Sequence, residues 1–176
     1  KQQSISDEID SIEDVLRGQY GSSELPMKRP GVLAKPILGG TVSQLYGATK
    51  FAQRAYKTKF HNGIDFAVPQ GTPVLAADDG IVLMAGNNGR VQYGRYIIIK
   101  HANGLASLYA HLSRQSVKTG DSVKRGETIG YSGNTGYSTG AHLHFGVYLG
   151  STVQLKAIGG AGVVPVGLTL DPEEYI

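Results

Sequence analysis

The sequence contains no cysteine and no tryptophan among its 176 residues. Without cysteine, the chain cannot form a disulfide framework, a Cys-type zinc finger, an iron–sulfur cluster or a thiol nucleophile. Any metal site must therefore use histidine, aspartate or glutamate ligands. The absence of thiols is also compatible with an oxidising compartment.

Long hydrophobic runs are absent as well. No apolar stretch approaches the roughly 18 residues that a membrane helix requires, and no basic-then-apolar signal segment opens the sequence. Because residue 1 is lysine rather than methionine, we expect an upstream targeting segment to be missing from this chain.

The charge is modest and unevenly distributed. Charged residues make up 18% of the chain and hydrophobic residues 40%, a balance that excludes a disordered or fibrous protein. Residues 1–30 hold four basic and six acidic side chains, whereas the remainder holds 13 basic and eight acidic ones. The basic residues form no run and are not interleaved with aromatic residues as in a nucleic-acid-binding face. We therefore expect no nucleic-acid partner.

Near the start of the chain, residues 4–17 have the pattern of an amphipathic helix. Ile5, Ile9, Ile12 and Leu16 follow one another at spacings of four, three and four, and acidic residues cluster near the start. Two alternatives are open for this helix. Either it caps the core of the domain, or it ends a longer coiled coil and contacts a coiled-coil or membrane-associated regulatory partner.

The chain divides into three expected segments. Residues 1–20 hold the helix, residues 21–36 are a linker rich in turn residues, and residues 37–176 form the compact domain. Within the domain, residues 159–167 are rich in glycine and small apolar side chains. We expect them to form a flexible loop, either a groove wall or an ordinary surface excursion.

The domain is predicted to be all-β. Its 25 glycines are about twice the average usage and follow no Gly-X-Y period, so they indicate many tight turns. Asn103-Gly104 between two β-branched runs is a hairpin signal. Gly71 and Gly120 each open a similar Gly-x-x-Val unit, which indicates a duplicated motif. We predict a mainly antiparallel sheet, preceded by a short N-terminal α-helix, with strands at 72–77, 81–85, 96–101, 105–111, 127–131 and 142–149.

Four of the five histidines lie in three short motifs. His61 and Asp65 are four positions apart and can face the same point on either a strand or a helix. His142 and His144 are two positions apart in a predicted strand, so both imidazoles point to one face. His111 ends another predicted strand. Imidazole nitrogens and carboxylate oxygens are zinc ligands, so this concentration indicates a metal centre.

The sequence around these motifs resembles peptidase family M23, the lysostaphin and LytM-type zinc endopeptidases. The similarity covers roughly residues 37–149 and the closing Asp171-Pro172, about two-thirds of the chain. Five blocks match in the order found in that family. They are residues 60–66, 71–74, 79–80, 108–112 and 140–145.

The resemblance implies a β-sheet groove in which His61, Asp65 and His144 bind Zn²⁺, with His111 and His142 as the catalytic pair. Three protein ligands leave a fourth position open, which is the arrangement of a catalytic zinc. One non-ligand imidazole can accept a proton and pass it to the leaving amine, while the other hydrogen-bonds the developing oxyanion.

The activity implied by the resemblance is that of a zinc metalloendopeptidase. Its substrate would be the peptide stems or cross-links of bacterial peptidoglycan, outside the cytoplasmic membrane, in the periplasm or at the cell wall. The alternative is a non-enzymatic module that activates a cell-wall amidase through the same groove, as relatives without metal ligands do. The complete ligand set favours the enzyme. A biotin or lipoyl carrier would explain the duplicated hairpins but leaves the histidines unexplained.

The sequence departs from the family pattern in two places. The family often carries a transition-state tyrosine before its first metal ligand, and here both Tyr46 and Tyr56 are candidates. Residues 150–169 form a longer insertion than is usual before Asp171. The fifth histidine, His101, directly precedes the hairpin turn, and we expect it to have only a structural role.

Overall fold

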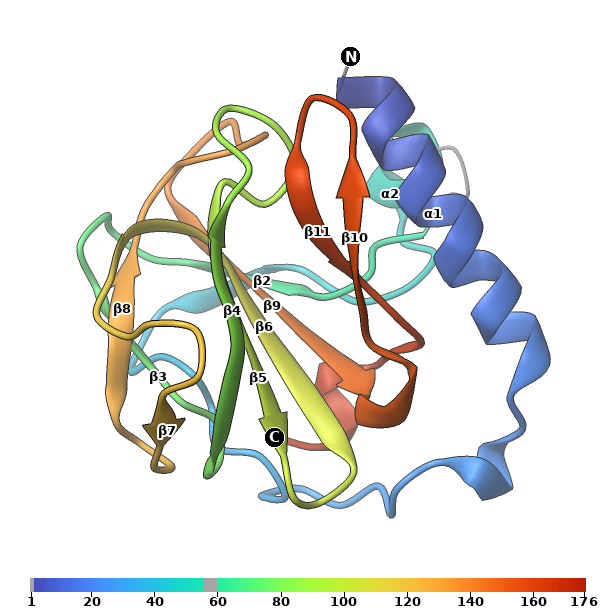
Figure 1. Ribbon diagram of the computed structural model, residues 1–176, viewed down its shortest axis with the longest axis horizontal. Helices are drawn as coiled ribbons and strands as arrows, with labels where there is room; N and C mark the ends of the chain where they lie inside the picture. Colours follow the sequence, from blue (N-terminus) through green and yellow to red (C-terminus); the bar gives the residue numbers. More distant parts are fainter. Residues whose placement is uncertain (1, 56–59) are drawn as a thin grey trace.

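The computed structural model describes residues 2–55 and 60–176. Its main feature is an antiparallel sheet with strand order β1-β2-β9-β6-β5-β4-β7, while β12 pairs with β9 and β8 pairs with both β3 and β6 (Figure 1). This sheet confirms the predicted fold class. The strands are β1 (Thr41–Gln44), β2 (Ile64–Ala67), β3 (Pro73–Leu75), β4 (Gly80–Asn87), β5 (Arg95–His101), β6 (Leu105–Gln115), β7 (Ser122–Val123), β8 (Thr128–Ser132), β9 (His142–Leu149) and β12 (Thr169–Leu170).

Each of the six predicted strands overlaps an observed one. The Asn103-Gly104 turn joins β5 to β6, and Gly104 adopts a φ of 85°, a left-handed conformation that favours glycine. The two similar sequence units interlock. β3 and β4 form the first unit and β7 and β8 the second, and β3 pairs with β8 while β4 pairs with β7.

The prediction of a flexible loop at residues 159–167 is wrong. Two strands, β10 (Gln154–Ile158) and β11 (Gly162–Val166), form an antiparallel hairpin there. The segment is ordered by tertiary contacts that its glycine content does not reveal, since Val164 is completely buried and the hydroxyl of Tyr96 donates to the carbonyl of Val163 at 2.7 Å. Glycine therefore marks the turn of a packed hairpin here.

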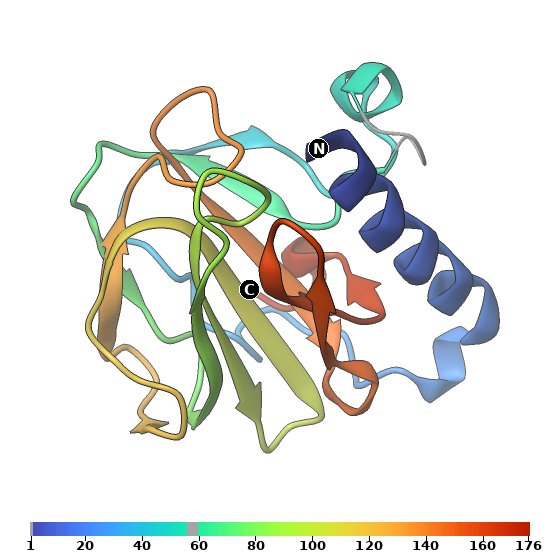
Figure 2. The ribbon, with the colours of Figure 1, turned by 45° about the horizontal axis from the view of Figure 1, so that its top comes forward.

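An amphipathic helix, α1 (Gln2–Gln19), lies along the side of the domain beside this hairpin (Figures 1 and 2). Ile5 and Ile9, from the predicted apolar stripe, are buried against Tyr96 and Val164 in one hydrophobic cluster. The stripe thus covers the domain's core. A shorter helix, α2 (Lys50–Ala55), precedes the first site motif, and the 3₁₀ turns are η1 (Ser22–Glu24), η2 (Gly150–Thr152) and η3 (Pro172–Glu174).

The larger hydrophobic cluster lies beneath the central strands. Phe66 of β2, Tyr109 of β6 and Phe145 of β9 are almost completely buried in it. Leu33, inside the segment expected to be a linker, is also fully buried there. Among the described residues, no helix has the length and apolar character needed to cross a membrane.

Candidate metal centre and active site

Two neighbouring strands bring the first and second histidine motifs together. In the register of β2 and β9, Asp65 lies opposite His144. His142 and His144 share one face of β9, as their spacing predicts, whereas Leu143 points into the hydrophobic core. His61 lies three residues before the start of β2, where a backbone bridge to Gly47 holds it.

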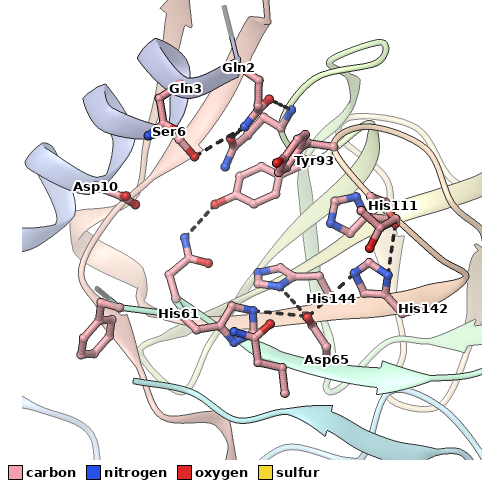
Figure 3. A pocket seen from close by; sticks show the side chains of 17 residues that line it. Gln2, Gln3, Ser6, Asp10, His61, Asp65, Tyr93, His111, His142 and His144 are labelled. Atoms are coloured by element: carbon pink, nitrogen blue, oxygen red, sulfur yellow. Dashed lines mark hydrogen bonds and ion pairs between the residues drawn. The ribbon is translucent and has the colours of Figure 1, made fainter. Parts of the chain in front are cut away.

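Asp65 is the shared centre of these contacts (Figure 3). Its Oδ1 lies 2.8 Å from Nδ1 of His144 and 3.4 Å from Nε2 of His61, and its Oδ2 lies 3.9 Å from Nε2 of His142. The Nδ1 atom of His61 is 2.9 Å from the carbonyl of Leu45, to which it can donate. That bond turns Nε2 of His61 toward the carboxylate. One potential ligand atom from each of His61, Asp65 and His144 lies within 4.8 Å of the others.

The electrostatics of the cluster suit a metal ion. Burial alone would raise the pKa of Asp65, but hydrogen bonds from His144 and His61 outweigh it and hold that pKa well below its usual range. Burial lowers the pKa of His144. The carboxylate is therefore ionised while the imidazole of His144 is neutral, and these are the protonation states that metal binding requires.

The packing around His144 also fits a ligand ring held in one orientation. A Cβ atom at Gly63 would lie only 2.6 Å from the carbonyl oxygen of Phe145 and 2.8 Å from Nε2 of His144. Only glycine lets the ring approach so closely. Nε2 of His144 is buried and has no hydrogen-bond partner among the residues that the structure describes, so the ring's polar interactions there are concentrated at Nδ1, beside Asp65. Two imidazoles and one carboxylate form a donor set that fits zinc.

Two further imidazoles lie beside this group. The ring centroids of His111 and His142 are 4.7 Å apart. Nδ1 of His111 lies 2.7 Å from the carbonyl of Thr135, and Nδ1 of His142 lies 2.8 Å from that of Gly140, so each ring can donate from this atom. Burial, together with the neighbouring His144 and His142, lowers the pKa of His111 to about 3. His111 is thus neutral near pH 7.

These side chains line a cavity of about 220 Å³. The structure brings all five of the predicted site residues together around it. The sequence interpretation missed the other residues of the wall, which come from α1, from the end of β1 and from loops that show no recognisable spacing. They are Gln2, Gln3, Ser6, Asp10, Gln44, Phe60, Asn62, Gln92, Tyr93, Tyr137, Ser138 and Thr139.

Of the two candidate tyrosines, Tyr46 is described by the structure and does not line the cavity. The hydroxyl of Tyr46 lies 2.9 Å from the carbonyl of Thr169, away from the cavity lining, and Tyr56 lies outside the described residues. Tyr93 does line the cavity, and its ring stacks on His144 with centroids 5.8 Å apart and an interplanar angle of 23°. His101 is buried elsewhere, between the carbonyl of Asp79 and the hydroxyl of Ser107.

An antiparallel sheet that carries a His-Asp-His group, with further imidazoles beside it, is the architecture of a metallopeptidase. The chain belongs to peptidase family M23, whose model matches residues 59–155. The DD-carboxypeptidase/endopeptidase Mpg of Neisseria gonorrhoeae is 45% identical over 147 residues, which are 84% of this chain and 31% of that protein.

Solved structures show the same fold. The catalytic domain of lysostaphin from Staphylococcus simulans has a TM-score of 0.58 and 31% identity, and the match covers 76% of this chain and 90% of that one. A zinc-containing peptidase from Vibrio cholerae has a TM-score of 0.60 and 28% identity, with 80% of this chain and 39% of the other covered. The chain spans about a third of the length of Mpg.

Proposed function

We propose that this chain is a zinc-dependent endopeptidase domain that hydrolyses peptide cross-links or stems of bacterial peptidoglycan. The observation that carries the proposal is the convergence of His61, Asp65 and His144 on one point, with His111 and His142 beside them in an accessible cavity. Membership of family M23 and the similarity to a DD-carboxypeptidase/endopeptidase support the substrate class. Because peptidoglycan lies outside the cytoplasmic membrane, we infer an extracytoplasmic place of action.

His61, Asp65 and His144 would hold the zinc ion. When bound, zinc supplies Lewis-acid polarisation of the peptide carbonyl and increases the acidity of a water molecule. The carboxylate of Asp65 offsets part of the positive charge, and its contacts with both imidazoles fix their ring orientations.

We assign proton transfer to His111. Its Nδ1 donates to the carbonyl of Thr135, so the neutral ring presents a lone pair at Nε2. Burial lowers its pKa to about 3, so the ring is a weak base that is unprotonated near pH 7, and its Nε2 lone pair is free to take a proton from an attacking water of increased acidity. The same ring can then deliver that proton to the leaving amine.

We assign stabilisation of the carbonyl oxygen to His142. Its Nδ1 is anchored by the carbonyl of Gly140, and its Nε2 lies 3.9 Å from Oδ2 of Asp65. When it carries both protons, Nε2 can donate a hydrogen bond to the oxygen on which negative charge develops.

The test combines zinc content with product analysis. Purified peptidoglycan is digested with the zinc-loaded protein, and mass spectrometry identifies the bonds that are cut. We expect His144→Ala to lose zinc, and His111→Ala to keep zinc but lose about 10²- to 10⁴-fold in turnover. His101→Gln, outside the cavity, is the matched histidine control and should retain both. Full activity of His111→Ala would refute its assigned role.

The non-enzymatic alternative has a distinct outcome in the same assay. An activator module would release no peptide from peptidoglycan but would increase the activity of an added cell-wall amidase. That result with the zinc-loaded protein would overturn the proposed endopeptidase.

A further inference from the structure

Helix α1 lies outside residues 59–155, the part matched by the family model, yet its polar side chains contact the loop that carries Tyr93. Gln2 forms two hydrogen bonds with Gln92. Its Oε1 accepts from the backbone N–H of Gln92 at 2.6 Å, and its Nε2 donates to Oε1 of Gln92 at 2.9 Å. Gln92 has a φ of 46°, a left-handed conformation that costs energy in a residue other than glycine. The helix therefore stabilises a strained position directly before Tyr93.

A second contact reaches the other end of Tyr93. Glu13 of α1 is 1% exposed, and its Oε1 accepts a hydrogen bond of 2.9 Å from Nδ2 of Asn62. The same amide group of Asn62 donates to the hydroxyl of Tyr93 at 2.9 Å. Asn62 directly follows His61 in the first metal motif. Burying a carboxyl group costs free energy unless the group is hydrogen-bonded, so the bond from Asn62 offsets part of the cost of burying Glu13 between α1 and the domain.

Tyr93 in turn contacts two of the functional histidines, one at its ring and the other at its backbone. Its ring stacks on His144, and its backbone carbonyl accepts a hydrogen bond of 2.8 Å from the N–H of His111. His111 has a φ of 62°, also left-handed, so its backbone position depends on such contacts. Figure 3 shows Tyr93 between Gln2 of α1 and His144.

We propose that Glu13 and Gln2 are positioning residues for the hydrolysis: α1 holds Tyr93 at its backbone and at its hydroxyl, and Tyr93 holds the ring of His144 and the backbone of His111. This inference rests on the proposed function. The apolar residues of α1, such as Ile5 and Ile9, attach the helix, whereas its polar residues Gln2 and Glu13 connect it to the site. Helix α1 is then a part of the active site that supports turnover.

The first experiment separates the hydrogen bond of Glu13 from its packing. Glu13→Leu removes the acceptor for Asn62 but still fills the buried space with an apolar side chain. Glu13→Gln retains an acceptor oxygen. On a soluble cross-linked muropeptide, we expect Glu13→Leu to lower kcat at least about tenfold with little change in KM and with one zinc still bound. Glu13→Gln should stay within about twofold of the wild type. Ile9→Val, a packing change on the same helix, should not change kcat.

A double-mutant cycle tests whether Glu13 acts through Tyr93. Tyr93→Phe removes the hydroxyl and keeps the stacked ring. If both residues act in one relay, Glu13→Leu should cause little further loss of kcat in the Tyr93→Phe background. Additive losses would overturn the relay, because a purely structural role of Glu13 would not depend on the tyrosine hydroxyl.

Other outcomes are equally decisive. Unchanged kcat in Glu13→Leu would overturn the proposal, and increased kcat would identify α1 as an inhibitory cap instead. All measurements are made below the melting temperature of each variant, with folding verified by circular dichroism. A zinc-loaded wild type that releases no product would refute the proposed function itself, which distinguishes that failure from failure of the positioning role.

Discussion

The carboxylate of Asp65 and the imidazole of His144 are direct partners in the β2–β9 register, and 2.8 Å separates Oδ1 from Nδ1. Backbone pairing of two adjacent strands therefore sets the spacing of two metal ligands. His61 reaches the same carboxylate from a position three residues before β2. A shift of one residue in register would turn His144 to the other face of the sheet, so the metal centre depends on the correct pairing of β2 with β9.

Asp65→Asn tests this shared carboxylate. The amide preserves size but removes the negative charge that holds both imidazoles, so we expect zinc affinity to fall at least about tenfold to a hundredfold. Competition with a chromophoric chelator measures the change. Asp10→Asn, at the α1 side of the same cavity, is the matched acidic control and should bind zinc as the wild type does. Equal affinity in both variants would show that Asp65 is not a ligand.

Gly63→Ala tests the close approach of His144. The added Cβ would meet the carbonyl of Phe145 at 2.6 Å and the ring of His144 at 2.7 Å, and backbone cannot yield cheaply there. We expect the ring to be displaced, zinc affinity to fall, and stability to drop by about 1–3 kcal/mol. Gly159→Ala, with open space around its Cβ position, is the control. Wild-type zinc affinity in Gly63→Ala would argue against the packing constraint.

Local periodicity explains how much of the site the sequence could reveal. The spacing in His142-Leu143-His144 gives two imidazoles on one strand face wherever the strand lies, and His61 and Asp65 are similarly close in sequence. Tyr93 could not be found in this way. Its contacts join α1 to residues far along the chain, as in the pairing of Gln2 with Gln92 across 90 positions. No local pattern encodes such a contact.

The same reasoning explains the error at residues 159–167. Glycine and proline there are ordinary signals of a loop. The segment is ordered because Val164 and Val166 are buried beside α1 and Tyr96, which lie far away in the sequence. Strands β4, β5, β6 and β9 were predictable because each has an alternating or continuous apolar pattern in its own sequence, and such a pattern indicates a strand with one or both faces buried.

Glu13→Gln should change how stability depends on pH. Burial raises the pKa of Glu13 to about 8 from 4.5, so the folded protein keeps this proton over a range in which the unfolded chain releases it. Stability contributed by the protonated form is therefore lost as pH rises from about 4.5 to about 8. Glutamine carries no such proton. We expect the variant to match the wild type near pH 5 and to exceed it at pH 8 by at least about 1 kcal/mol.

Urea unfolding at pH 5, 6.5 and 8 measures this difference. Glu8→Gln serves as control because Glu8 is an exposed acidic residue on the same helix. If the difference in unfolding free energy between the wild type and Glu13→Gln is the same at pH 8 as at pH 5, Glu13 is ionised in the folded protein.

His101 should make the domain sensitive to acid in a separate pH range. The ring is buried between the carbonyl of Asp79 and the hydroxyl of Ser107, at 2.7 Å and 2.8 Å. Burial lowers its pKa below 6.5, despite the opposing effect of the Asp79 carbonyl and the nearby carboxylates of Asp78 and Asp79. As pH falls below 6.5, the unfolded chain binds a proton that the folded chain excludes, so stability is lost.

We therefore expect His101→Gln to reduce the loss of unfolding free energy between pH 7.5 and pH 5.5. At pH 7.5 the variant itself should be about 1–2 kcal/mol less stable, because glutamine cannot keep both hydrogen bonds. Urea unfolding of the zinc-loaded proteins measures both effects, and the contribution of the metal-site histidines cancels because both proteins contain them. An identical pH dependence in the two proteins would show that the buried ring titrates as it does in the unfolded chain, and that the polar contacts of His101 offset the cost of its burial.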